Sequence, residues 1–183
     1  MALGSSGRAV WALYALIPLL LIPAGIGAEA ALGKYSPGAA RNATLFATIS
    51  GLTMLLGLAR WPTIMWELGR AWPGASPEQQ ASMATLFAGL NSYLGNFLGE
   101  FVGELGLNLF FALTAWAMLA DRTRPRWMGI AGLVVSVVGF AAMFRNVTPA
   151  VGAIAEANNL VLPVWVVVFG VLLLRTRDTQ SAE

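Results

Sequence analysis

The chain has 183 residues, of which 57% are hydrophobic and 11% charged, against roughly 45–50% and about 25% in ordinary soluble domains. A soluble domain of this size would have too few charges to cover its surface, so the composition predicts an integral membrane protein. The net charge of +2 comes from dispersed Lys and Arg without a basic block, which excludes a nucleic-acid partner. The sequence contains no Cys and no His, which excludes disulfides, Cys/His zinc sites and His-ligated haem. We expect no cofactor and no metal.

Apolar stretches recur along the whole chain and predict an all-α, polytopic transmembrane helical bundle of about five spans in a single domain. The predicted spans are residues 9–32, 43–59, 97–119, 127–144 and 160–174. Pro18 and Pro23 should kink the first span without breaking it, because a bundle can satisfy the freed carbonyls. The motif Ala28-Glu29-Ala30 after an apolar stretch leaves a cleaved signal peptide as the alternative to a retained first span.

Residues 61–95 are predicted to form an outer interfacial and loop region between the second and third spans. After Trp61-Pro62 the apolar side chains share one face, as in a short helix lying at the membrane interface. Residues 73–80 indicate a loop, in which Ser76 offers a helix cap and Pro77 a helix start. Residues 81–120 would extend about 60 Å as one helix, against a hydrocarbon core of about 30 Å. We therefore divide them into an outer helical approach and the third span.

The positions of Lys and Arg predict an N-terminus outside and a C-terminus in the cytoplasm, because cytoplasmic ends of spans carry more basic residues. With the 121–126 turn inside, seven basic residues lie on the cytoplasmic side and four outside. The seven are Lys34, Arg41, Arg122, Arg124, Arg126, Arg175 and Arg177, and the four are Arg8, Arg60, Arg70 and Arg145.

A four-residue repeat before and within the third span places polar side chains on one helical stripe inside an apolar run. The stripe consists of Asn96, Glu100, Glu104 and Asn108, and a stripe of glycines at 95, 99 and 103 runs beside it. Small residues let another helix approach closely. An ionisable residue within a membrane is a candidate functional residue.

Basic partners for this stripe follow from helix length. Antiparallel packing of the third and fourth spans about residues 123–124 places Arg145 level with Gly103, within reach of both carboxylates. Arg60, at the outer end of the second span, is a second predicted partner. The polar residues before the fifth span should belong to the same outer layer. The predicted ligand-binding residues are Asn96, Glu100, Glu104, Asn108, Arg145, Arg60, Glu156 and Asn159.

This polar set has two interpretations. In one, it is a network of ion pairs and hydrogen bonds that locks the spans together. In the other, it lines an outer-leaflet pocket that binds a lipid, a small amphiphile or a partner subunit. The alternative function is proton- or cation-coupled transport of a small molecule through Glu104. A membrane enzyme acting through the carboxylate pair is a third hypothesis. We favour a non-enzymatic binding protein, with membrane lipids and a partner subunit or second copy of the chain as partners.

Several short motifs of the second half occur in a fixed order. They are Asn-Leu-Phe-Phe at 108–111, Pro125-Arg126-Trp127-Met128-Gly129, Glu156 and Asn159 before Leu162-Pro163-Val164-Trp165, and the final stretch 170–175. In this order, residues 81–177 resemble a bacterial multispanning membrane family, the domain of unknown function 4386 family. The resemblance implies a helical bundle in the bacterial inner membrane with the 125–126 turn in the cytoplasm. Members of that family commonly have one span more than predicted here, and the resemblance carries over no catalytic residue.

Overall fold

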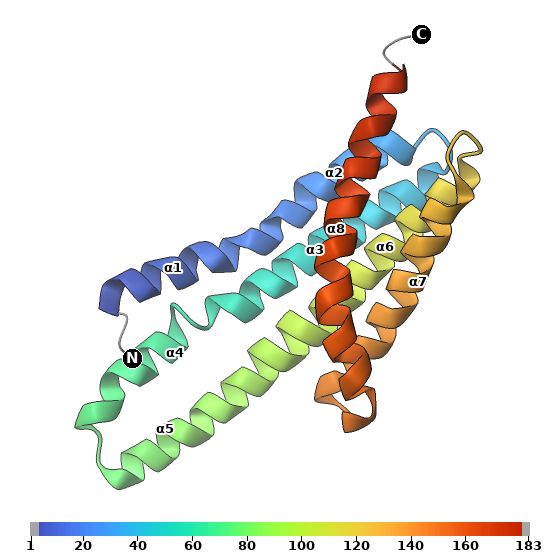
Figure 1. Ribbon diagram of the computed structural model, residues 1–183. Coiled ribbons are helices and arrows are strands. Elements are labelled where there is room, and N and C mark those ends of the chain that lie inside the picture. The colour runs from blue at the N-terminus through green and yellow to red at the C-terminus, as the bar shows by residue number, and fades with distance from the viewer. Residues whose placement is uncertain (1–3, 181–183) are drawn as a thin grey trace.

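The computed structural model describes residues 4–180, and it describes the side chains of this range except those of residue 5 and of residues 174–180. Arg175 and Arg177, two of the basic residues that favour a cytoplasmic C-terminus, therefore lie outside the described side chains. Within the described chain the fold is all-α, without strands, as predicted. Five helical rods are long and apolar enough to cross a membrane (Figure 1). They are Ser6–Leu32, Pro37–Gly74, Pro77–Ala120, Arg126–Asn146 and Pro149–Leu173.

The first rod consists of α1 (Gly4–Leu16), the 3₁₀ turn η1 (Ile17–Leu20) and α2 (Leu21–Leu32). Pro18 lies in the 3₁₀ turn, so the rod changes winding there without breaking. The rod packs on α3 (Pro37–Ala59) through small residues: a Cβ added to Gly25 would lie 2.9 Å from that of Ala47. The Thr44 hydroxyl adds a polar link, 2.7 Å from Oε2 of Glu29.

The second rod continues past α3 into α4 (Ile64–Ala71) and η2 (Trp72–Gly74), and turns into α5 (Pro77–Leu90). This α4–α5 hairpin occupies the predicted 61–95 region; α4 corresponds to the short interfacial helix and α5 to the outer helical approach. The predicted loop shrinks because its prolines occupy the first turns of η2 and α5 and so begin helices. Ser76 caps α5 in a capping box with Gln79, as its position predicts.

The third rod runs without a break from α5 through η3 (Asn91–Val102), a stretch of π-helix, into α6 (Gly103–Ala120). The expected division of this segment therefore appears as a change in winding rather than as an interruption. A 44-residue rod is far longer than the bilayer core is thick. Consequently the α4–α5 hairpin projects from the bundle, as Figure 1 shows at the lower left.

At the opposite end of the bundle, a tight turn connects α6 to α7 (Arg126–Ala142). The Asp121 carboxylate is 2% exposed and accepts hydrogen bonds from the Thr123 amide at 2.9 Å and from Nε of Arg124 at 2.7 Å. Burial acts to raise the pKa of Asp121, but the hydrogen bonds from Thr123 and the charge of Arg124 outweigh it and hold that pKa below its usual value. We call this end the turn end and the other the hairpin end.

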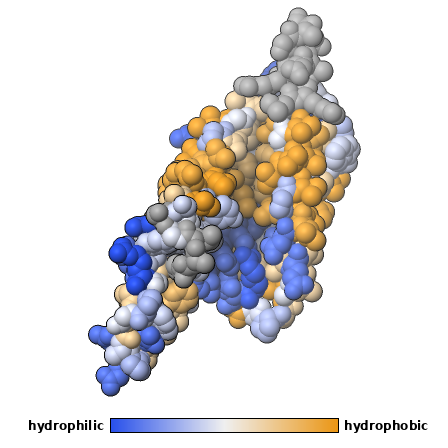
Figure 2. Space-filling view, turned by 60° about the vertical axis from the view of Figure 1, so that its left-hand side comes forward, coloured by the Kyte–Doolittle hydropathy of each residue, from blue (hydrophilic) through white to orange (hydrophobic). Residues whose placement is uncertain are grey.

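The short 3₁₀ turns η4 (Met143–Asn146) and η5 (Pro149–Val151) lead from α7 to α8 (Gly152–Gln180). The predicted polar connection at 156–159 is instead the beginning of α8. The core lies between α2, α3, α6, α7 and α8, mostly toward the turn end. Its largest enclosed side chains include Phe110, Phe111, Leu32 and Met118. Figure 2 shows a hydrophobic surface over the body of the bundle, with hydrophilic residues gathered below it, beside the projecting hairpin.

Candidate functional site

Arg145, directly after α7, joins this end of the bundle to η3 and to the beginning of α6 through three charge-assisted hydrogen bonds. Its Nη1 donates to Oε2 of Glu104 at 2.7 Å, and its Nη2 donates to Oε1 of the same carboxylate at 2.6 Å. Nη2 also donates to Oε2 of Glu100 at 3.0 Å. The Asn146 side-chain amide donates to that oxygen at 2.6 Å. The contact predicted from helix lengths is present, and the Arg145–Glu104 pair is bidentate, which is a strong and directional geometry.

Arg60 holds a second, separate position near the end of α3. Its Nε donates to Oδ1 of Asn91 at 3.1 Å, and its Nη1 donates to the carbonyl of Gly57. The guanidinium lies against the backbone of Gly95, where an added Cβ would lie 2.6 Å from Nη2. Residue 95 must therefore lack a side chain for Arg60 to occupy this position. The contact between Gly57 and Gly99 has the same requirement, because a Cβ on Gly57 would lie 2.5 Å from the Gly99 Cα.

A cavity of about 280 Å³ lies between the first rod, α3 and η3 at the hairpin end. Its charged lining consists of Arg60, Glu100 and Glu104. Its remaining lining is mostly apolar or small, and consists of Tyr14, Pro18, Met54, Gly57, Leu58, Gly95 and Gly99. The volume is close to the lower limit of about 300 Å³ for ligand pockets, so the cavity has room for a small polar group.

The cavity lies about one hydrocarbon-core thickness away from the turn end. Glu100 is twenty residues from Ala120 at the turn end, which corresponds to about 30 Å of α-helix, the thickness of the hydrocarbon core. Aromatic side chains gather at the same level: Trp11 stacks on Trp61 with ring centroids 5.4 Å apart, and Trp11 meets Tyr14 edge-on at 5.7 Å. Aromatic residues are enriched at membrane interfaces.

The structure brings together some of the predicted site residues and separates others. Arg60, Glu100, Glu104 and Arg145 meet in and around the cavity. Asn108 is 3% exposed and lies deeper, against Gly139 of α7, where it fills the helix interface. Asn96 is half-buried and does not line the cavity.

Two predicted residues of α8 point away from the site. Glu156 and Asn159 are exposed and do not line the cavity, because the helical register of α8 turns Asn158 inward instead. Sequence reasoning assigned these residues a depth in the membrane but had no information on the direction in which they point.

Sequence reasoning also missed three polar residues. Asn146 directly follows the predicted site residue Arg145, and this position in the sequence was the signal that could have identified it. Asn91 and Tyr14 had no such signal, since their approach depends on how the first rod and η3 pack on α3.

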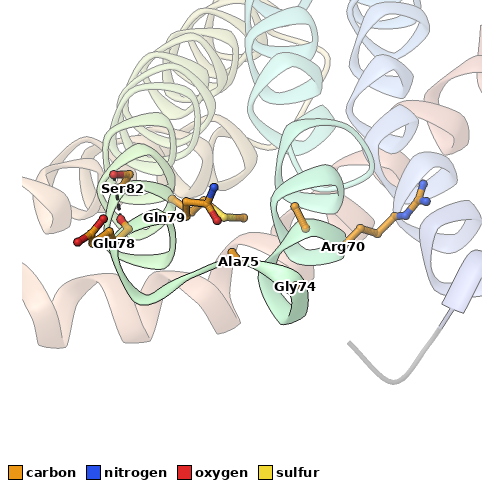
Figure 3. A pocket seen from close by; sticks show the side chains of 8 residues that line it. Arg70, Gly74, Ala75, Glu78, Gln79 and Ser82 are labelled. Atoms are coloured by element: carbon orange, nitrogen blue, oxygen red, sulfur yellow. Dashed lines mark hydrogen bonds between the residues drawn. The ribbon is translucent and has the colours of Figure 1, made fainter.

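The hollow at the tip of the α4–α5 hairpin is larger, about 810 Å³, but it is shallow and lacks a comparable cluster. Figure 3 shows Arg70 extending from α4 away from Glu78 and Ser82, while the Ser82 hydroxyl donates to the Glu78 carbonyl at 3.1 Å. Its charged groups therefore do not converge on a ligand. Among the described residues, no group of three or more Asp, Glu, His or Cys could hold a metal ion.

The arrangement is that of a membrane-spanning helical bundle with an ion-paired polar cluster at one end of its apolar body. Comparison with known families assigns it further: the chain belongs to the family described as Domain of unknown function (DUF4386), which it matches over residues 1–176. The match covers nearly the whole chain and not the second half alone. No curated protein and no solved structure matches this chain.

Proposed function

We propose that this protein is a non-enzymatic integral membrane protein whose hairpin-end cavity binds a membrane lipid or a small amphiphile. The observation that carries the proposal is the composition of the cavity wall, which combines charged side chains with the apolar Pro18, Met54 and Leu58. A ligand with a polar head and an apolar tail satisfies both kinds of lining, since buried charges need partners and apolar walls favour hydrocarbon.

The cavity suits an amphiphile better than a partner subunit, the other predicted occupant. About 280 Å³ accommodates a headgroup but not a protein segment. We place the cavity in the outer leaflet of a bacterial inner membrane, with the N-terminus outside. The excess of Lys and Arg toward the turn end supports this orientation.

The alternative, proton- or cation-coupled transport through Glu104, has less support. Both carboxylate oxygens of Glu104 accept hydrogen bonds from Arg145, so a transported cation would have to displace a bidentate partner. The same contacts of Arg145 also hold η4 against α6. This structural role is compatible with ligand binding, because Glu100 pairs with Arg145 and also lines the cavity.

Native mass spectrometry of the protein extracted in mild detergent tests the proposal. The wild-type protein should retain bound lipid or amphiphile. Leu58→Trp introduces a larger side chain into the cavity at its apolar wall and should reduce the fraction of protein that carries bound lipid or amphiphile several-fold. Leu86→Trp introduces the same side chain on α5, outside the cavity, and serves as the matched control. Equal retention by both variants, or no retained amphiphile on the wild-type protein, would refute the proposal.

A further inference from the structure

Arg60 presents an unused hydrogen-bond donor to the cavity. Its Nε and Nη1 are engaged by Asn91 and Gly57, which fix the guanidinium in place. Among the described residues, Nη2 has no hydrogen-bond partner, and it is not one of the fully enclosed polar atoms. A fixed guanidinium with a free N–H is suited to bind an anionic oxygen.

Glu100 presents the complementary acceptor. Its Oε2 is occupied by Arg145 and Asn146, whereas its Oε1 has no hydrogen-bond partner among the described residues. The Glu100 side chain is 39% exposed. Glu100 and Arg60 line the same cavity and interact electrostatically, yet they are not in ion-pair contact with each other. The cavity is therefore lined by one residue that has a free acceptor and one that has a free donor.

The charges around this cavity favour a ligand that is neutral as a whole but carries both signs. Arg60 and two glutamates line it, and Arg145, outside the lining, pairs with both glutamates, so the four charges of the cluster cancel. A simple anion would bind Arg60 but meet repulsion from Glu100, and a simple cation would meet the reverse. A zwitterion satisfies both groups.

The cationic part should be a primary ammonium. Oε1 of Glu100 needs a hydrogen-bond donor, which a primary ammonium supplies and a quaternary ammonium lacks. Quaternary ammonium groups are typically held by aromatic cages, and Tyr14 is the single aromatic residue of this lining. The Tyr14 hydroxyl, which has no partner among the described residues, adds a donor for the anionic part.

From this geometry we propose that the cavity binds a phosphoethanolamine headgroup, with its phosphoryl oxygens on Arg60 and Tyr14, its ammonium on Glu100 and its hydrocarbon tail along Pro18, Met54 and Leu58. This inference rests on the proposed amphiphile binding and names the class of headgroup.

Lipid titrations of the detergent-solubilised full chain, read by native mass spectrometry, test the inference. The probes are phosphatidylethanolamine, phosphatidylcholine and phosphatidylglycerol with identical acyl chains, and soluble phosphoethanolamine. One charge-assisted hydrogen bond should make the first lipid bind about tenfold more tightly than the second. Competition by soluble phosphoethanolamine at concentrations similar to the lipid supports the headgroup chemistry and identifies a free ligand. Competition only at far higher concentrations supports the lipid as the ligand.

Variants test the contributions of Glu100 and Tyr14 separately. Glu100→Gln should bring the affinity for phosphatidylethanolamine down to that for phosphatidylcholine, while the exposed Glu67→Gln, outside this cavity, should retain the preference. Tyr14→Phe removes one hydroxyl from a half-exposed side chain and should weaken all phospholipids alike, which provides a second test if Glu100→Gln fails to fold. Saturable lipid binding without headgroup preference, or a preference for phosphatidylglycerol, would overturn this inference while leaving amphiphile binding intact. Absence of any bound lipid would overturn both.

Discussion

Replacing Arg145 with glutamine removes the cation that joins α7's end to η3 and α6. Glu104, whose side chain is 14% exposed, would lose the donors to both of its oxygens, and Glu100 would keep the amide of Asn146. Breaking a buried ion pair from one side costs about 3–5 kcal/mol, and exposed pairs are worth about 0–1 kcal/mol. Because the Arg145 side chain is 23% exposed, we expect a loss of about 2–3 kcal/mol.

Thermal unfolding in a mild detergent without added lipid measures this loss. For a chain of this size each kcal/mol corresponds to about 2–4 °C, so the midpoint should fall by roughly 4–12 °C. Arg126→Gln, an exposed arginine at the turn end, is the control and should change little. The double variant Arg145→Gln with Glu104→Gln should recover part of the loss, because the unpaired carboxylate is then also gone. Equal midpoints for Arg145→Gln and the control, or strictly additive losses in the double variant, would refute the reasoning.

Three further predictions concern local structure. The carboxylate of Asp121, with its pKa held below the usual value, contributes stability above about pH 4 that is lost as pH falls through the lower folded pKa; Asp121→Asn should therefore flatten the acid side of a stability-versus-pH curve, and an unchanged acid slope would contradict this. Gly57→Ala places a Cβ 2.5 Å from the Gly99 Cα and should cost about 1–3 kcal/mol, whereas Gly89→Ala, which meets open space, should not destabilise in the same thermal assay. Ser76→Ala removes the α5 cap and should cost about 1 kcal/mol locally, seen as faster amide exchange in the first turn of α5; unchanged exchange there would argue against the capping box.

The sequence alone was sufficient for the helical class and for the contact between Arg145 and the carboxylates. Both follow from segment lengths: apolar runs define helical rods, and equal distances from the 121–126 turn place Arg145 level with Gly103, next to Glu104. Pro77 and Ser76 likewise mark the beginning of α5 in the sequence, through fixed backbone geometry and a local hydrogen bond.

Directions around a helix axis could not be obtained in this way. Asn158 and Asn159 are neighbours in sequence, yet one is 3% exposed and the other lies on the surface. The contact of Arg60 with Asn91 lies at the start of the π-helical stretch η3, whose winding rotates side chains away from α-helical positions. Neither the helical periodicity of the sequence nor a count of its charges predicts that rotation.

The unbroken third rod also has a mechanical consequence. Residues 77–120 form one continuous helical rod, which Gly99 brings into close contact with Gly57 of α3. The α4–α5 hairpin and the carboxylates Glu100 and Glu104 therefore share one backbone, whose winding changes in η3. We expect a displacement of the hairpin to move the charged wall of the cavity as well.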